Sequence, residues 1–278
     1  MKKKAYKAYV VGSQTSKSLS PTIFNYWFKK YNIEGEYSFL EVDEKKFEEE
    51  IKKKFEDPSV CGLNITIPFK EKVVSLISET DNHSKLIGAV NCITKNKKKL
   101  FGKNTDWIGF KKSILFFEKK TKRINRNKAT IIGYGGSSKA ILYALNNMGY
   151  LYVDLWNRSF DKIENITRFD KIKIYPKKLD IKNFDIDMNS SIVINTIPTN
   201  YYYKNNKNSF LKSSNTFGYD LVYNIRTDFL KRFPKTKQVH GISLLVHQAA
   251  PCFELWFNKK PTIDEDLYSI LYKKLESF

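Results

Sequence analysis

The sequence predicts an α/β protein of two domains, and three observations lead to this fold class. The first third of the 278 residues alternates strand-like and helix-like segments in a β-α-β-α-β-α order. A second α/β unit starts at Lys128 and contains a glycine-rich turn at 133–136. Hydrophobic residues make up 41% of the chain, which is enough to bury a substantial core.

The first domain is expected to begin with strands and helices joined by short connections. In order, these are a strand at 6–12, a helix at 21–31, a strand at 36–42, a helix at 43–55, a strand at 60–67 and a helix at 68–78. Residues 90–94 and 100–103 then predict a short hairpin across the lysine-rich turn 97–99. Alternation of this kind predicts a largely parallel sheet covered by helices.

A helix at 107–119 is expected next, because its apolar side chains recur at a helical spacing that suits a bridge between two domains. The second domain follows with a strand at 129–132, a helix at 137–148 and strands at 151–156, 192–196 and 216–221. The polar and aromatic stretch 201–208 has no period and predicts a loop. Two helices, at 243–257 and 264–275, end the chain on either side of Pro261.

Charge and cysteine content narrow the function classes. The formal net charge is +20 at pH 7, but the excess is almost all lysine and is spread along the chain. Because nucleic-acid readers favour arginine and none of their motifs is present, we interpret this charge as surface composition. The cysteines, Cys61, Cys92 and Cys252, lack the spacing of a disulfide framework or a zinc site, so no metal is expected. No apolar run is long enough for a membrane helix or a signal core, which favours a cytoplasmic protein.

The turn at 133–138, with the sequence GYGGSS, lies between a predicted strand and a predicted helix. Glycines in this position let the backbone approach a pyrophosphate, and the free amides of the helix start face the anion. Ser138 replaces the third glycine of GxGxxG and is still small enough for close packing. The favoured interpretation is a Rossmann domain that binds a dinucleotide. A tight turn without a ligand is the alternative.

The residues after the second strand of this domain favour NADP over NAD. Folds that select NAD place an acidic residue there for the ribose hydroxyl. This chain has Asn157, Arg158 and Ser159 instead, and Lys162 follows one turn later. A guanidinium and short polar donors suit a 2′-phosphate. The alternative is that Asn157 and Ser159 cap the following helix while Arg158 is solvated.

The N-terminal segment SKSLSP, at 16–21, has the character of a small anion site. Ser20 is expected at the N-cap of a helix and Pro21 at its first position. The hydroxyls of Ser18 and Ser20 would then lie beside the free amides of the helix start, which suits a carboxylate. Capping alone explains Ser20 but leaves Ser18 unexplained.

Taken together, these segments resemble the shikimate dehydrogenases over nearly the whole chain, from Val11 to Trp256. The motifs that carry the resemblance are SxSP, NITIPFK at 64–70, GAVN at 88–91, GKNTD at 102–106, GYGG, NRS, YDLVY at 219–223 and GISLLVHQAAPCFELW at 241–256. The resemblance implies an NADP-dependent oxidoreductase that interconverts 3-dehydroshikimate and shikimate in aromatic amino acid biosynthesis.

The resemblance also implies a division of the chain into two domains with the substrate in the cleft between them. Residues 1–107 plus 241–278 would form an α/β substrate domain, to which the C-terminal helices return. Residues 108–240 would form the Rossmann domain that binds NADP. A small-molecule substrate is the partner expected, without nucleic acid or membrane, and the sequence is compatible with a homodimer.

The catalytic residues implied by the resemblance are a lysine and an aspartate, here Lys70 and Asp106. A lysine held beside a carboxylate can exchange the hydroxyl proton of a secondary alcohol while the cofactor exchanges the hydride. By composition alone, Lys70 would be one more surface lysine.

The other site residues also come from the resemblance. Those implied for the substrate are Ser18 and Ser20 at the carboxylate, and Thr66, Asn91, Asp106, Tyr223 and Gln248 at the ring hydroxyls. Those expected around NADP are Gly133, Tyr134, Gly135, Gly136, Ser137, Asn157, Arg158, Ser159, Lys162, Leu221 and Gly241. Alternatively, Asn91 and Gln248 satisfy buried backbone groups and Tyr223 is a core aromatic residue.

The sequence departs from the family pattern near the expected nicotinamide site. Ser243 and Leu244 replace a glycine and a methionine there, and the serine is expected to narrow the pocket. Two other functions stay open at this point. One is a quinate dehydrogenase of the same fold that uses NAD, and the more distant one is a basic nucleic-acid-binding module, which only the net charge supports.

Overall fold

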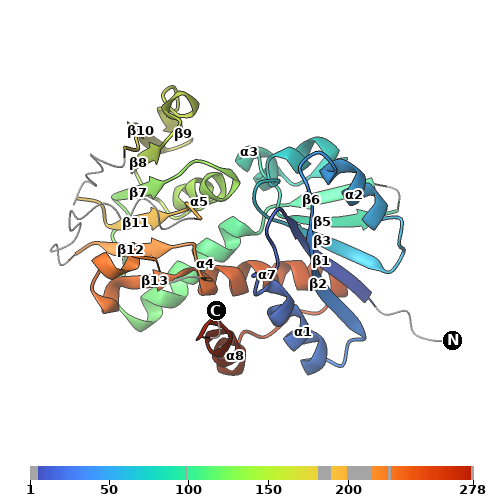
Figure 1. Cartoon of the computed structure of the whole chain (residues 1–278). Helices are drawn as coiled ribbons and strands as arrows, with labels where there is room; N and C mark the ends of the chain where they lie inside the picture. The colour runs from blue at the N-terminus through green and yellow to red at the C-terminus, as the bar shows by residue number, and fades with distance from the viewer. Residues whose placement is uncertain (1–5, 98, 181–188, 199–214, 225–226, 277–278) are drawn as a thin grey trace. The chain divides into compact units, whose positions relative to one another are not determined.

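The structure, a computed structural model, describes residues 6–97, 99–180, 189–198, 215–224 and 227–276. The chain divides into two compact units (Figure 1). Unit 1 consists of Met1–Gly109 and Leu245–Phe278, and unit 2 of Phe110–Leu244. The loop expected at 201–208 lies outside the described residues. Within the described ranges, no helix is both long enough and apolar enough to cross a membrane.

Unit 1 is built on a six-stranded sheet with the order β2-β1-β3-β5-β6-β4. Its strands are β1 (Tyr6–Gly12), β2 (Gly35–Glu41), β3 (Val60–Ile65), β4 (Glu79–Thr80), β5 (Cys92–Asn96) and β6 (Lys99–Lys103). β1 is parallel to β2 and β3, and β4 is parallel to β6, whereas β5 is antiparallel to its two neighbours. The sheet is therefore mainly parallel, as predicted, and contains the predicted β5–β6 hairpin.

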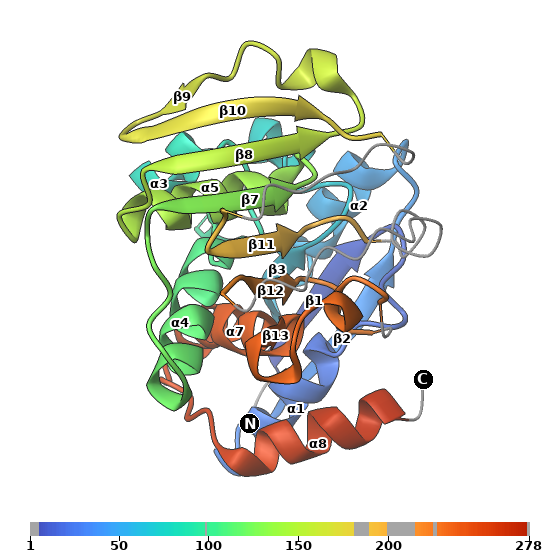
Figure 2. The same ribbon diagram turned by 90° about the vertical axis from the view of Figure 1, so that its left-hand side faces the viewer.

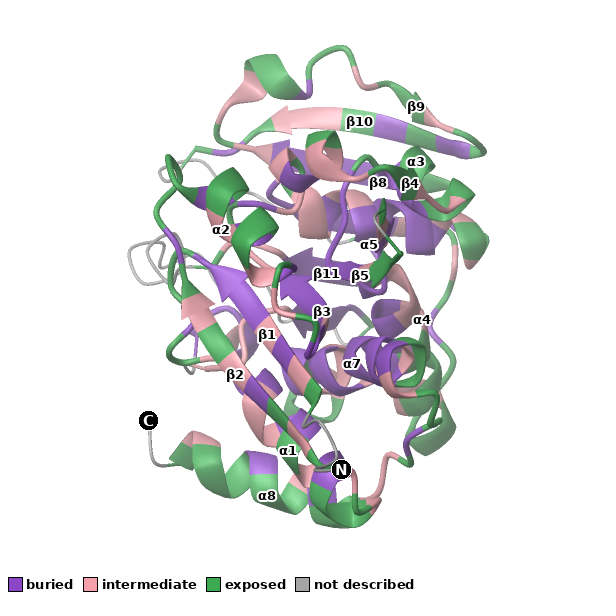
Figure 3. Cartoon of the chain, turned by 90° about the vertical axis from the view of Figure 1, so that its right-hand side faces the viewer, coloured by how far each residue is buried: buried purple, intermediate pink, exposed green. Residues whose placement is uncertain are grey.

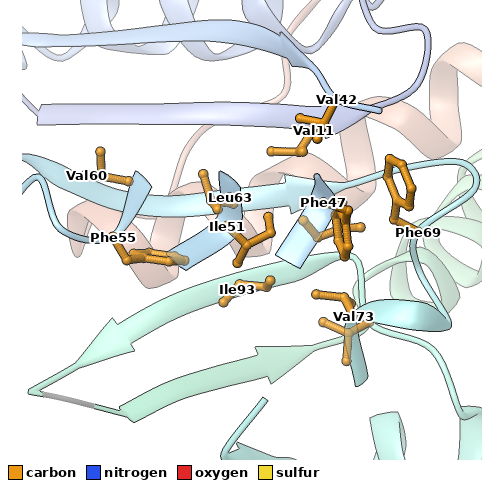
Figure 4. Close-up of a cluster of buried hydrophobic side chains, with 12 residues drawn as sticks. Val11, Val42, Phe47, Ile51, Phe55, Val60, Leu63, Phe69, Val73 and Ile93 are labelled. Carbon is orange, nitrogen blue, oxygen red and sulfur yellow. The ribbon is translucent and has the colours of Figure 1, made fainter. Parts of the chain in front are cut away.

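Helices pack on the two faces of this sheet. Those of unit 1, or reaching into it, are α1 (Ser20–Lys30), α2 (Phe47–Lys54), α3 (Asn82–Ile87), α4 (Asp106–Lys120), α7 (Gly241–Phe257) and α8 (Glu265–Glu276). Leu63 of β3 packs in a buried cluster with Phe47 and Ile51 of α2 (Figure 4). On the other face, a Cβ added to Gly62 would lie 2.0 Å from the ring of Trp256 in α7. Successive residues of β3 thus contact helices on opposite faces of the sheet, as strand geometry requires.

An aromatic cluster joins α1 to α7 in unit 1. The ring of Phe253 lies 5.3 Å from that of Trp27 and 5.8 Å from that of Phe24, and Trp256 stacks on Phe24 at 5.5 Å. Figure 3 shows that α7 is largely buried where it passes beside the sheet. α7 is therefore part of the core of unit 1.

The helix predicted at 68–78 is wrong. A single 3₁₀ helix spans Lys72–Leu76, after a turn that contains the cis peptide bond between Ile67 and Pro68. The carbonyl of Lys70 accepts from the backbone N–H of Val90 at 2.8 Å, while the N–H of Val74 turns to Glu71. Because the Lys70 carbonyl is bonded to Val90, in the segment between α3 and β5, an α-helical ladder cannot run through this segment.

Unit 2 is built on a seven-stranded sheet with the order β13-β12-β11-β7-β8-β10-β9 (Figure 2). Its strands are β7 (Lys128–Ile132), β8 (Tyr152–Asn157), β9 (Arg168–Phe169), β10 (Ile172–Lys178), β11 (Ile192–Asn195), β12 (Phe217–Asp220) and β13 (Gln238–His240). All neighbours pair in parallel except β9 and β10. In chain order the six parallel strands follow 3-2-1-4-5-6, which is the order of doubly wound dinucleotide-binding sheets.

Most of α4 lies in unit 2, and α5 follows the first strand of the sheet. Besides α4, the helical segments among the described residues of unit 2 include α5 (Gly136–Asn147) and the 3₁₀ turns η2 (Phe160–Lys162), η3 (Leu230–Arg232) and η4 (Lys235–Lys237). The strand order of the sheet reverses between β7 and β11. In folds of this kind, ligands bind beyond the carboxyl ends of the strands at such a point. The glycine turn leaves β7 at this place.

Candidate active site

Lys70 and Asp106 form a buried ion pair in unit 1. Lys70 Nζ lies 2.5 Å from Asp106 Oδ2, and the two side chains are 12% and 6% exposed. The backbone bond from Val90 to the carbonyl of Lys70 holds the turn that carries Lys70. Charges this deeply buried need a hydrogen-bonded partner, and here each supplies it to the other.

The carboxylate of Asp106 is held by one donor on each oxygen. Oδ2 accepts from Lys70, and Oδ1 accepts from Asn91 Nδ2 at 2.8 Å. Asp106 is also the first residue of α4, where the helix dipole favours a negative charge, and its backbone N–H donates to Asn104 Oδ1. The pair therefore has a defined geometry before any ligand is bound.

Asn91 is oriented by the residues around it. The backbone N–H of Thr105 donates to Asn91 Oδ1 at 2.7 Å, which fixes the oxygen side of the amide. Asn91 Nδ2 is consequently directed to Asp106 and lies 3.2 Å from Gln248 Oε1. Gln248, on α7, is itself held by a bond from Nε2 to the carbonyl of Leu245. The structure thus brings together Lys70, Asn91, Asp106 and Gln248, from four separate segments of the sequence.

Ser18 and Ser20 lie at the start of α1, but Ser20 is not its N-cap as predicted. The helix begins at Ser20 itself, and Leu19, whose side chain makes no capping bond, occupies the cap position. Instead, the hydroxyl of Ser18 accepts from the backbone N–H of Ser20 at 3.2 Å. Pro21, one residue further on, has no N–H to satisfy, which permits this tighter start.

The loop before Ser18 is held by Glu41, which the sequence analysis did not single out. Glu41 Oε1 accepts from the backbone N–H groups of Ser16 and Thr15, both at 2.8 Å. These bonds, that from Ser16 first, hold the pKa of Glu41 below its ordinary value. A carboxylate at the end of a strand gives no sequence signal of such a role, because many surface glutamates look the same.

Thr66 lies directly after β3 and is half-buried. Its backbone N–H donates to the carbonyl of Val11 at 2.9 Å, and its methyl group lies against Gly12, where an added Cβ would come within 2.5 Å. This close approach of β1 to the end of β3 requires the glycine. It fixes the chain just ahead of Lys70.

The glycine turn of unit 2 needs Gly133 and Gly135 for different reasons. Gly133 has φ +100°, and an added Cβ would lie 2.5 Å from Thr196 Oγ1, so the fold itself requires a glycine there. Gly135 has φ −130°, and an added Cβ would meet nothing within 4 Å. Open space over backbone at the start of α5 fits the approach of a pyrophosphate.

Ser138, the replacement for the third glycine, ties the turn to the neighbouring strand. Its hydroxyl lies 2.6 Å from Thr196 Oγ1 and accepts from the Gly135 N–H at 3.3 Å. Tyr134 and Ser137 are partly exposed beside it, and Lys139 Nζ lies 5.4 Å from the centre of the Tyr134 ring. The backbone N–H of Gly135, one of the donors expected to face an anion, is therefore bonded within the turn. α5 begins at the next residue, Gly136.

The residues after β8 present a basic side chain to solvent. Asn157 Nδ2 donates to the carbonyl of Ser159 at 2.8 Å, which closes the turn, and Arg158 and Lys162 are exposed. Ser159 precedes η2 without a side-chain capping bond. In this structure Asn157 thus shapes the turn, and Arg158 is displayed at its tip.

Leu221 and Gly241 are brought together directly after the carboxyl ends of β12 and β13, which run parallel to β7. A Cβ added to Gly241 would lie 2.3 Å from the carbonyl oxygen of Leu221, so only glycine allows this contact. The buried carboxylate of Asp220 supports the same loop, since Oδ1 accepts from the N–H of Val222 and from Asn195 Nδ2. Burial raises the pKa of Asp220. Tyr223 follows as a half-buried side chain.

No group of three or more His, Cys, Asp or Glu side chains in the described parts of the chain is arranged to hold a metal ion. Cys61, Cys92 and Cys252 are free thiols. Burial raises the pKa of the Cys92 thiol well above its ordinary value.

Comparison with known proteins gives one consistent family. The family model "Shikimate dehydrogenase substrate binding domain" matches residues 10–93. The shikimate dehydrogenase (NADP(+)) of Caldicellulosiruptor saccharolyticus is 32% identical over 270 residues, covering 91% of this chain and 92% of the relative. That of Bartonella tribocorum is 32% identical and covers 99% of this chain and 96% of its own. A solved shikimate dehydrogenase in complex with NADP+ aligns with a TM-score of 0.81 at 26% identity, covering 98% of this chain and 96% of the other.

Proposed function

Because the chain belongs to the shikimate dehydrogenase family, we propose that it interconverts 3-dehydroshikimate and shikimate with NADP as cofactor. The observation that carries this proposal is the buried Lys70–Asp106 pair, held by Asn91. This reaction would place the enzyme in aromatic amino acid biosynthesis. The free cysteines support a reducing location, which we propose to be the cytoplasm.

Oxidation of a secondary alcohol removes a hydride from carbon and a proton from oxygen, and bound NADP accepts the hydride. Lys70 Nζ is the group proposed to exchange the proton with the substrate oxygen. Asp106 keeps the ammonium in place through Oδ2 and is itself kept in place through Oδ1. In the direction of ketone reduction, Lys70 gives the proton to the forming hydroxyl.

Substrate binding is proposed to use two groups of side chains. Ser18 and Ser20 would hold the carboxylate at the start of α1, where Glu41 has already fixed the preceding loop. The ring hydroxyls would be held by Thr66, Asn91, Asp106, Tyr223 and Gln248. The side-chain amide of Asn91 is already bonded to Thr105 and Asp106. We therefore propose that Asn91 contributes more by orienting Asp106 than by binding the substrate.

NADP binding is proposed for unit 2, at the carboxyl ends of β7 and β8. The open space at Gly135 and the start of α5 fit the pyrophosphate, and the exposed Arg158 fits the 2′-phosphate. The further residues proposed for this site are Gly133, Tyr134, Gly136, Ser137, Asn157, Ser159, Lys162, Leu221 and Gly241. We accordingly propose 1–107 plus 241–278 as the substrate domain and 108–240 as the cofactor domain.

One assay tests the function directly. Absorbance at the reduced-nicotinamide band is followed with shikimate or quinate, each with NADP and with NAD. Reduction of NADP that requires shikimate is the expected result. Turnover of quinate with NAD, without turnover of shikimate, would replace the proposal by the quinate dehydrogenase alternative.

A further inference from the structure

A chain of buried hydrogen bonds in unit 1 leads from β2 to the catalytic pair. Tyr37, on β2, is 1% exposed, and its hydroxyl donates to Asn64 Oδ1 at 2.9 Å. Asn64, on β3, is 5% exposed, and its Nδ2 donates to the carbonyl of Asn91 at 2.9 Å and to Cys252 Sγ at 3.2 Å. The proposed chemistry of the site assigns no task to Tyr37 or Asn64.

The direction of these bonds is fixed. The carbonyl of Asn91 can only accept, so the atom of Asn64 that faces it is Nδ2, which also faces Cys252. Oδ1 is then the atom that faces Tyr37, and the tyrosine hydroxyl must donate to it. The carbonyl of Asn91 accepts at the same time from the backbone N–H of Ile65 at 2.9 Å. Both lone pairs of this carbonyl are therefore engaged, and the backbone of Asn91 is held by two residues of one strand.

Asn91 is held at its other end as well. The Thr105 N–H fixes the side-chain oxygen, and Nδ2 reaches Asp106 Oδ1 at 2.8 Å. A shift of the Asn91 backbone would thus be transmitted to the carboxylate that pairs with Lys70. Small displacements at such a distance from the reacting atoms can cost large factors in rate.

We propose that Tyr37 and Asn64 are positioning residues for the Lys70–Asp106 pair, acting through Asn91. This inference rests on the proposed function. Asn64 supplies the donor that locates the Asn91 backbone, and Tyr37 keeps the Asn64 amide in the one orientation that can do so. Neither residue is required to touch substrate or cofactor.

Two variants test the chain of bonds. Tyr37→Phe removes the hydroxyl but keeps the ring that stacks on Phe24 at 4.1 Å. Asn64→Asp keeps the shape and the acceptor for Tyr37 but removes both amide donors. Tyr26→Phe is the matched control, since it also removes a 2.9 Å tyrosine hydroxyl bond within unit 1, from α1 to Asp264 directly ahead of α8.

Both test variants should lower kcat for shikimate about tenfold or more, with KM for NADP unchanged, because the defect lies in the geometry of proton transfer. The pH at which kcat/KM is half-maximal should move in the same variants. Tyr26→Phe should alter only the melting temperature. If Tyr37→Phe and Asn64→Asp have the same kinetic parameters as Tyr26→Phe, the proposal is overturned. If Asn64→Asp does not fold, Tyr37→Phe alone still provides the test.

A second readout needs no substrate. The rate at which a small amine-reactive reagent acylates Lys70, followed by peptide mass spectrometry, should rise at least about threefold in Tyr37→Phe and Asn64→Asp, because Lys70 loses a fixed partner. It should stay constant in Tyr26→Phe. If the native enzyme shows no shikimate-dependent NADP reduction, the proposed function fails. If Lys70 acylation is unchanged in the test variants, the positioning role fails independently.

Discussion

The polar groups of the two units are satisfied in contrasting ways. Around Lys70 in unit 1, side chains bond to one another and are almost completely buried, as at Asn64, Asn91 and Asp106. At the glycine turn of unit 2, the backbone at Gly135 faces open space and Arg158 is exposed. A proton-transfer pair needs a fixed geometry, whereas a phosphate site needs accessible donors. The contrast teaches that the two proposed tasks call for opposite amounts of internal hydrogen bonding.

The largest effect on activity is expected in the buried hydrogen-bonded site of unit 1. Lys70→Ala should lower kcat by ~10²–10⁴ while KM for shikimate changes little, because the proton transfer belongs to the transition state. Initial rates with saturating NADP measure this. A variant that kept native turnover would remove Lys70 from the mechanism.

In the glycine turn of unit 2, one glycine is expected to serve the stability of the fold and the other the binding of NADP. Gly135→Ala should leave the melting temperature nearly unchanged but raise KM for NADP by ~10–100-fold, because the methyl group enters the space left for the ligand. Gly133→Ala should instead lower the free energy of unfolding by about 1–3 kcal/mol, since its φ is +100° and Thr196 is in the way. Thermal unfolding and NADP titration, performed on both variants, distinguish the two effects. A large loss of stability in Gly135→Ala would contradict this division.

Arg158 tests whether the exposed basic tip reads the 2′-phosphate. Arg158→Ala should raise KM for NADP about tenfold and leave KM for NAD nearly unchanged, because a charge-assisted bond is lost with one cofactor only. Lys162→Ala, one turn away, shows how far general charge contributes. Equal effects of Arg158→Ala on both cofactors would show that Arg158 does not select NADP.

A smaller effect is expected at Glu41, which fixes the loop before Ser18. Its folded pKa lies below the ordinary 4.5, so its contribution to stability is complete above that pH and is lost as the pH falls through the folded pKa. Glu41→Gln should therefore lose less stability than the native protein between neutral pH and pH about 3, and should raise KM for shikimate about threefold. Melting temperatures across this range measure the first effect. Glu254→Gln, an exposed glutamate on α7, is the control, and the same acid sensitivity in all three proteins would refute the role of Glu41.

The weakest interaction is expected in the binding of nucleic acid to the lysine-rich surface. Because the lysines are dispersed, binding of labelled duplex and single-stranded oligonucleotides at physiological ionic strength should be weak and independent of sequence. Saturating NADP and shikimate serve as competitors. Tight, sequence-dependent binding that NADP displaces would place nucleic acid at the cofactor site and reverse this interpretation.

Most elements were predictable because their periodicity is local. The strand at 172–178 was not predicted, since it contains Pro176 and three lysines, yet it forms β10 at the side of β8. β9 pairs with β10 only at residues 172 and 173, so the missing N–H of Pro176 does not break a ladder on that side. Conversely, the helix at 68–78 failed because the carbonyl of Lys70 is bonded to Val90, a partner that no local pattern reveals.

The site shows the same limit. Lys70, Asn91, Asp106 and Gln248 could be named because each lies in a motif of the resemblance, and the structure links them by hydrogen bonds. Tyr37 and Glu41 could not be named from β2 alone. Their roles arise only when strands distant in sequence pair, so that a side chain of one reaches the loop or amide of another. Spacing along the chain carries no trace of such contacts.

Unit 1 is formed by two segments that lie far apart in the sequence, and this affects its biosynthesis. Unit 2 is continuous in sequence, so all of it is translated before the second segment of unit 1, Leu245–Phe278, is made. Phe24 and Trp27 of α1 and the flat surface at Gly62, by contrast, must wait for Phe253 and Trp256 to be translated. The nascent first unit therefore exposes an aromatic surface until α7 is made, and such an exposed surface is a site where aggregation can begin during synthesis.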